Sequence, residues 1–119
     1  MNHKNLNAWK ESITLVKEVY TLIDNFPKKE IFALSSQMQR SAISIPSNIA
    51  EGAGRNSDKE FVHFCYIAMG SLAELETQLI IATELNYINK EHEIFNVITN
   101  VRKLLSGLIA YLKNKDKEN

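Results

Sequence analysis

The sequence predicts an all-α protein, an antiparallel four-helix bundle with an up-down-up-down order of helices. Apolar residues recur at intervals of three and four through almost the whole chain, which is the spacing of amphipathic helices. Only two prolines and four glycines among 119 residues offer points at which helices could end. A chain of this length builds one hydrophobic core, so residues 1–119 are expected to form a single domain.

The first helix is predicted over residues 8–25, with Asn7 as its N-cap and Phe26 and Pro27 at its end. Its expected core stripe consists of Trp9, Ile13, Val16, Tyr20 and Ile23. The second helix is predicted over residues 28–53, with a core stripe of Ile31, Leu34, Met38, Ala42, Ile45 and Ile49.

Pro46 and two glycines shape the second helix. Pro46 removes the hydrogen bond to the Ala42 carbonyl, and because the helical pattern continues beyond it, it predicts a kink rather than a break. Gly52 and Gly54 are expected to close the helix, since glycine readily takes the left-handed conformation found just after helix ends.

The third helix is predicted over residues 58–85 and the fourth over residues 90–113. Ser57 and Glu60 have the spacing of a capping box, and Asn86 is expected to end the third helix in the left-handed conformation. Asn89 is expected to cap the fourth helix. The predicted core stripe of the fourth helix is Ile94, Val97, Val101, Leu104, Leu108 and Tyr111.

The third helix carries two apolar stripes, and one of them suffices for the bundle core. That core stripe is Phe61, Cys65, Ala68, Leu72, Leu75, Leu79 and Ala82. In a monomeric bundle each helix keeps one side in water, so the second stripe predicts an interface with another copy of the chain. A helix packed deep against both neighbours is the alternative. The predicted interface residues are Val62, Tyr66, Met69, Ala73 and Ile80.

Polar residues follow the second helix at spacings of three and four. Arg40, Ser44, Asn48 and Glu51 form this stripe, and antiparallel packing places Arg40 level with Glu74 of the third helix. We expect a hydrogen-bond network in which Arg40 contacts Glu74 and in which Asn48 and Glu51 are largely buried. A catalytic use of the stripe is the alternative.

The sequence favours neither a metal site nor a phosphate-binding loop. Glu60 and His63 form a Glu-x-x-His pair, but a di-iron bundle needs that pair twice. The run from Gly52 to Arg55 follows no strand and lacks a closing Gly-Lys-Ser/Thr. No cofactor, metal or catalytic residue is therefore predicted.

Composition favours a cytoplasmic protein that does not cross a membrane. Charged residues interrupt every apolar stretch, and the first residues do not resemble a signal peptide. The single Cys65 cannot form an intramolecular disulfide. Basic and acidic residues number 14 each, so net charge alone does not identify a polyanionic partner.

Four basic residues are candidates for contact with RNA or DNA. Lys10 and Lys17 share a face of the first helix, and Arg102 and Lys103 of the fourth could extend it into a basic band. Nearby acidic residues favour a mixed surface instead. We expect at most weak binding that is independent of nucleic-acid sequence.

Two segments carry a family resemblance: residues 37–61, QMQRSAISIPSNIAEGAGRNSDKEF, and residues 71–79, SLAELETQL. They resemble the bacterial four-helix-bundle proteins encoded in intervening sequences of 23S ribosomal RNA genes. The resemblance implies a cytosolic ring of five subunits without established enzymatic activity. A related accessory protein of diversity-generating retroelements uses a strongly basic surface, whereas this chain has balanced charge and Gln39 beside Arg40.

Together these observations predict a non-enzymatic homo-oligomeric scaffold or interaction protein, with nucleic acid or a ribonucleoprotein as the suggested partner. A purely protein-binding module is one alternative. An enzyme that uses Glu51, Glu74 or His63 is the other.

Overall fold

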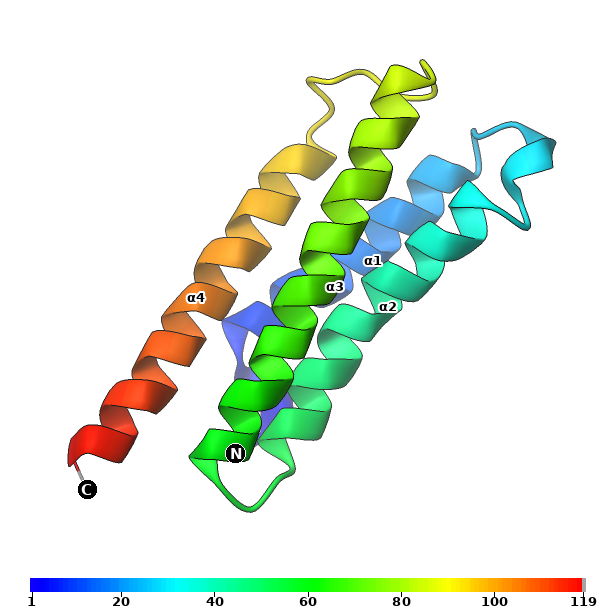
Figure 1. The fold of residues 1–119 in the computed structure, drawn as a ribbon. Helices are drawn as coiled ribbons and strands as arrows, with labels where there is room; N and C mark the ends of the chain where they lie inside the picture. The colour runs from blue at the N-terminus through cyan, green and yellow to red at the C-terminus, as the bar shows by residue number, and fades with distance from the viewer. Residues whose placement is uncertain (119) are drawn as a thin grey trace.

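The computed structural model describes residues 1–118 and confirms the predicted bundle of four long helices (Figure 1). The long helices are α1 (Asn7–Ile23), α2 (Leu34–Ala53), α3 (Asp58–Glu84) and α4 (Ile94–Glu118). Two short 3-10 helices precede α1 and α2, namely η1 (His3–Asn5) and η2 (Lys28–Glu30).

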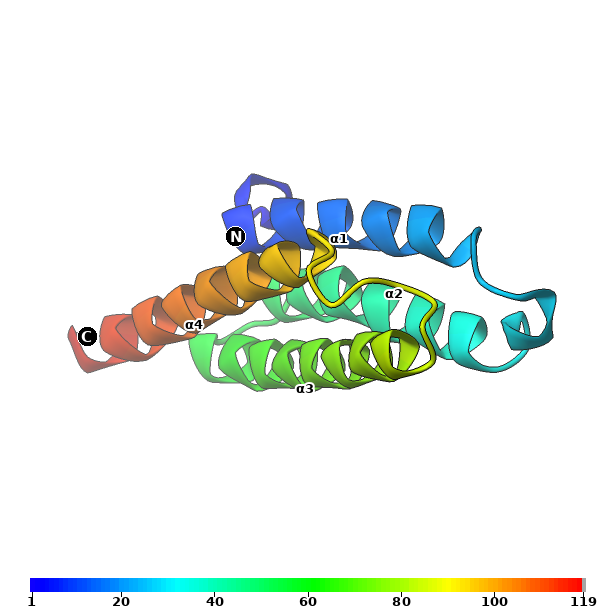
Figure 2. The ribbon, with the colours of Figure 1, turned by 90° about the horizontal axis from the view of Figure 1, so that it is seen from above.

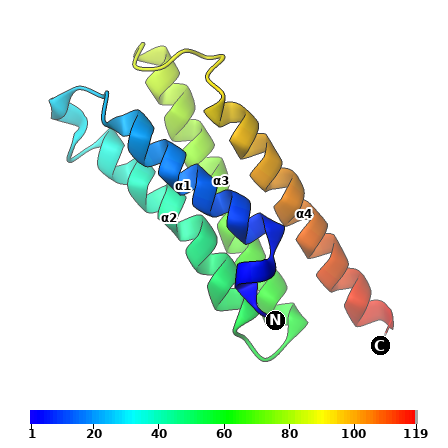
Figure 3. The same cartoon turned by 180° about the vertical axis from the view of Figure 1, so that it is seen from behind.

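Each long helix packs against two others. The packed pairs are α1 with α2, α2 with α3, α3 with α4, and α4 with α1. Figure 2 views the bundle from above and shows α1 and α3 on opposite sides, with α2 and α4 between them. Seen from behind, the last turns of α4 extend beyond the beginning of α1 (Figure 3), because α4 has 25 residues and α1 has 17.

Two helices begin later than predicted. Pro27 has an extended backbone, and residues 28–30 then form a 3-10 turn instead of the start of α2. Ile31 is consequently exposed in the connection and does not belong to the core stripe. Asn89 caps a turn by accepting from the Glu91 amide at 2.7 Å, and α4 begins only at Ile94.

The predicted left-handed end of α3 is confirmed, and so is the serine half of the predicted capping box at its start. The Ser57 hydroxyl accepts from the Glu60 amide at 3.2 Å. Asn86 has a φ of 63°, and the Tyr87 amide donates to the Ala82 carbonyl at 2.9 Å. The Asn86 amide donates to the Thr83 carbonyl, so the helix ends in a Schellman motif with asparagine in the left-handed position.

Gly54 caps the end of α2 as predicted, but the predicted left-handed conformation was wrong, because neither Gly52 nor Gly54 has a positive φ. Gly54 continues the right-handed conformation, with a φ of −85° and a ψ of −2°. Gly52 lies inside α2 and is buried against the start of α3. A Cβ atom there would lie 2.8 Å from the Phe61 ring and 2.8 Å from the Cβ of Phe64. Gly52 therefore permits close helix packing rather than a turn.

The core stripes of α2 and α3 are largely as predicted, whereas those of α1 and α4 are shifted by about one residue. All seven residues of the α3 stripe are buried, as are Met38, Ala42, Ile45 and Ile49 of α2. The buried residues of α1 are Ala8, Ser12, Leu15, Val19 and Leu22. Those of α4 are Ile94, Ile98, Val101, Leu105, Ile109 and Leu112.

Within the described residues, α3 is the one helix long and apolar enough to cross a membrane by length and composition. Its apolar stripe instead packs inside the bundle, where all seven stripe residues are buried. The bundle core thus accounts for much of the apolar character of α3.

Candidate interaction surfaces

The predicted interface on α3 is partly exposed in the single chain. Tyr66 is 49% exposed and Ile80 is 50% exposed, while Val62 and Met69 are half-buried against the core. The alternative, that α3 packs deep against both neighbours, therefore fails for these residues. We call this surface the α3 ridge and define it as Tyr66, Ile67, Met69, Ala73, Ile80 and Ile81.

The α3 ridge stands on a helix with almost no cationic side chains. From Glu60 to Asn89 the chain contains no Lys or Arg. Glu84 lies three and four residues after Ile81 and Ile80, and so stands beside them on the helix surface. A cation from α4 approaches the other end of the ridge, where the Lys113 ammonium donates to the Tyr66 hydroxyl at 2.6 Å.

Part of the predicted polar network lies between α2 and α3. The hydroxyl oxygens of Ser44 and Ser71 are 2.8 Å apart. The Asn48 amide group donates to the Ser44 hydroxyl at 2.9 Å and to the Ser44 carbonyl at 2.8 Å. This chain of hydrogen bonds joins the two helices at a fixed register.

Three members of the predicted network, Arg40, Glu51 and Glu74, do not join that chain. Arg40 and Glu74 line one cavity of about 340 Å³ beside Ser44 and Ser71, but within the described residues they form no ion pair. The expected burial of Glu51 was wrong. Its side chain lies in the last turn of α2, is 55% exposed and pairs with Arg55 at 2.7 Å.

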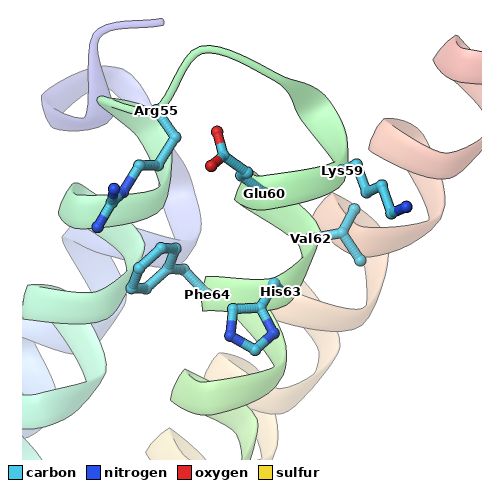
Figure 4. Close-up of a pocket in the computed structure, with 6 residues that line it drawn as sticks. All are labelled: Arg55, Lys59, Glu60, Val62, His63 and Phe64. Atoms are coloured by element: carbon cyan, nitrogen blue, oxygen red, sulfur yellow. The ribbon is translucent and has the colours of Figure 1, made fainter.

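A shallow hollow of about 540 Å³ lies over the first turns of α3 (Figure 4). The Arg55 guanidinium stands 4.8 Å from the centre of the Phe64 ring, and the His63 ring meets that ring edge-on. Glu74 lies eleven residues beyond His63, about 16 Å along the helix. His63 and Glu74, two of the three candidate enzyme residues, therefore do not share one site.

Other reactive side chains have structural surroundings. Cys65 is fully buried, and this burial raises the pKa of its thiol to about 11. The Tyr87 hydroxyl donates to the Glu30 carboxylate at 2.7 Å, which raises the pKa of Tyr87. No group of three His, Cys, Asp or Glu side chains suited to a metal ion occurs among the residues that the structure describes.

The four basic candidates do not form one band. Lys10, Lys17 and Lys103 are exposed, but the Arg102 guanidinium reaches across to α3 and pairs with Glu76 at 2.7 Å. This ion pair balances the Arg102 charge locally, which argues against the predicted extension of the band from α1.

An apolar groove between α1 and α2 was not predicted. Its volume is about 340 Å³, and the His3 ring packs edge-on against Trp9 at one end. Ile43 is 43% exposed within it. We call it the α1–α2 groove and define it as Trp9, Ile13, Val16, Ile43, Pro46 and Ala50. Three of these residues had been predicted to lie in the core.

The fold and these surfaces define a helical bundle protein whose candidate sites are packing faces and grooves. The family model of the 23S rRNA-intervening sequence protein matches residues 4–107, and the chain belongs to that family.

Similarity to a solved structure supports the fold. That structure is a protein of unknown function from the S23 ribosomal protein family of Bacteroides thetaiotaomicron, with a TM-score of 0.71 and 24% sequence identity. The match covers 89% of this chain and 98% of that chain. No curated protein matches.

Proposed function

We propose that this protein is a non-enzymatic, cytoplasmic homo-oligomeric scaffold whose copies associate through the α3 ridge. The ring of five implied by the family resemblance is the proposed assembly. It would present its repeated outer surface to nucleic acid or to a ribonucleoprotein.

The exposed apolar α3 ridge is the observation that carries this proposal. Complete burial of a large aliphatic or aromatic side chain contributes roughly 1.5 to 3 kcal/mol. Ile80 and Tyr66 are about half exposed, so covering each would contribute on the order of 1 kcal/mol. Contiguous apolar patches of this kind are typical of interfaces between chains.

The partner class rests on the family name, and the charge distribution limits the expected affinity. Arg102 is already paired with Glu76, so fewer cations are free to neutralise phosphates than the sequence indicated. A purely protein-binding module is the second candidate, and the apolar α1–α2 groove favours it. An enzyme that uses Glu51, Glu74 or His63 is the third candidate, and no observation on these residues favours it.

The self-association is tested by sedimentation. We expect the purified chain to sediment as a multimer at micromolar concentration, and Ile80→Lys to shift it to the monomer by placing a charge in the contact. Met69→Lys should act in the same direction, but Met69 also packs against the core. Ile80 is therefore the cleaner position.

Phe32→Lys is the matched control, since Phe32 is 96% exposed in the α1–α2 connection and far from the ridge in sequence. It should leave the mass unchanged. A monomeric wild-type chain would refute the proposal, and an Ile80→Lys variant with unchanged mass would place the interface elsewhere.

A further inference from the structure

Two apolar surfaces of the molecule are exposed on different helices. The α3 ridge lies on α3, and the α1–α2 groove lies between α1 and α2. Figure 2 shows α1 and α3 on opposite sides of the bundle, and these two helices do not pack against each other. The ridge and the groove therefore cannot cover one another within one chain.

The shapes of the two surfaces are complementary. Tyr66, Met69, Ala73 and Ile80 of the ridge form a row spaced at intervals of three, four and seven, and Ile67 and Ile81 flank this row. The groove is concave, with walls formed by Ile13 of α1 and Ile43 of α2. A row of side chains on one helix packs into the groove between two others in the same way as in helix packing within proteins.

Charge argues against pairing of the ridge with its own copy. A contact between two ridges would bring the Glu74 residues of the two chains close together, because Glu74 lies near the middle of the ridge, whereas Lys113 of α4 reaches only the Tyr66 end. No Lys or Arg of α3 beyond Lys59 could compensate. Like charges at the border of an interface disfavour association.

The border of the groove carries the opposite charge. Lys10 and Lys17 are three and four residues from Ile13, so both stand beside it on the surface of α1, and both are exposed. Helix geometry places Glu11 and Glu18 on the other flank of the buried stripe, toward α4. The side of α2 that lines the groove contributes Ile43, Pro46, Ser47 and Ala50, none of which is acidic.

We propose that the α1–α2 groove binds the α3 ridge of a second copy, so that subunits associate head to tail. This inference rests on the proposed self-association and names the surface that receives the ridge. A head-to-tail contact uses two different patches on each subunit, and it generates a ring when the rotation between subunits closes. A ridge that paired with itself would stop at a dimer.

Mixing two blocked variants tests this arrangement. Ile43→Glu places a carboxylate in the groove, and Ile80→Glu places one on the ridge. Each variant alone should sediment as a monomer. An equimolar mixture should form a complex of twice the monomer mass and nothing larger, because only one intact groove and one intact ridge remain. Both substitutions are acidic, so the two altered surfaces repel each other when they meet.

The controls separate folding from assembly. Formation of the two-chain complex itself shows that both variants fold, and circular dichroism of each variant alone should match the wild type. Phe32→Glu should keep the full assembly. At low salt, the double variant Lys10→Glu, Lys17→Glu should assemble at least tenfold more weakly than the wild type. The wild-type assembly should itself weaken as salt rises.

Three other outcomes would contradict the inference. If Ile43→Glu keeps the full mass while Ile80→Glu is monomeric, the ridge binds a surface other than the groove; the head-to-tail inference fails, and self-association through the ridge stands. If both variants are monomeric and their mixture stays monomeric, the inference also fails. A monomeric wild-type chain would overturn the inference and the proposed function together.

Discussion

Gly52 shows how one hydrogen atom in place of a side chain permits close packing of two helices. We predict that Gly52→Ala lowers the free energy of unfolding by about 1 to 3 kcal/mol, because the new methyl group would meet Phe61 and the Cβ of Phe64. This loss exceeds the gain of up to about 1 kcal/mol from the better helix propensity of alanine. Urea denaturation measures the difference.

Gly107 provides the control for that comparison. It lies inside α4, and a Cβ atom there would have no neighbour within 4 Å. Gly107→Ala should therefore stabilise the protein by up to about 1 kcal/mol. Equal effects of the two substitutions would contradict the packing role assigned to Gly52.

Cys65 predicts a dependence of stability on pH. Its thiol has a pKa of about 11 in the folded chain and an ordinary value of 9.0 when exposed, so only the unfolded chain ionises between these values. Stability from this group is complete below pH 9 and is lost as pH rises toward 11, by on the order of 2 kcal/mol. Cys65→Ala should show a shallower decline over that range in denaturant titrations. Parallel curves would exclude the effect.

The roles of single residues could be predicted where they depend on the local backbone conformation alone. Ser57 and Asn86 take the capping and left-handed roles that their positions indicate. Gly52 was predicted to close α2, because the sequence alone does not show that Phe64 of another helix packs against it. Glu51 was predicted to be buried, because helix spacing identifies the residues that share a face. It does not show how far along that face the neighbouring helix covers it.

Among the helices, α1 and α4 show why an apolar stripe can be predicted on the wrong face. Both have apolar side chains over a wide arc, and the largest of these, such as Trp9 and Tyr111, lie beside the core rather than in it. The true centre of the α1 stripe contains Ala8 and Ser12, which are small because the neighbouring helices are close. The sequence prediction thus took the larger and more apolar side chains as the core, although the helix itself was correctly predicted.

The Schellman end of α3 leads to a prediction for the α3–α4 connection. Asn86→Ala should destabilise the protein by roughly 1 kcal/mol, because alanine meets a steric penalty at a φ of 63° that asparagine partly escapes. Asn86→Gly should be neutral or slightly stabilising at the same position. Thermal unfolding of both variants gives the comparison. A loss of equal size in both would mean that the asparagine side chain, rather than the backbone conformation, matters.

On the scale of the whole molecule, the surfaces were less predictable than the bundle. The α1–α2 groove needs residues from two helices, and its existence depends on which faces turn outward. The pairing of Arg102 with Glu76 likewise depends on how α3 and α4 are placed side by side. Four residues of the α3 ridge, Tyr66, Met69, Ala73 and Ile80, could be predicted because a single helix carries them and their periodicity is readable along the chain, whereas Ile67 and Ile81 were not predicted.

Balanced charge limits how strongly the assembled protein should bind nucleic acid. We predict at most weak, sequence-independent binding to single-stranded RNA and duplex DNA that falls steeply as salt rises, since phosphate contacts would dominate. Fluorescence anisotropy across a salt series measures it, and Lys103→Glu should reduce any binding, since Lys103 is exposed and lies outside the proposed groove. Absence of binding at about 50 mM salt would favour a protein partner. Tight, salt-insensitive, sequence-selective binding would contradict the charge distribution described above.

The lack of lysine and arginine along most of α3 has a practical consequence for mapping the assembly. Trypsin cleaves after those residues, so a complete digest releases residues 60–90 as one peptide. Reagents that modify lysine cannot label the ridge, whereas Lys10 and Lys17 beside the groove remain open to them. Protection of those two lysines from acetylation in the assembled protein, read by mass spectrometry, would therefore report on the groove alone.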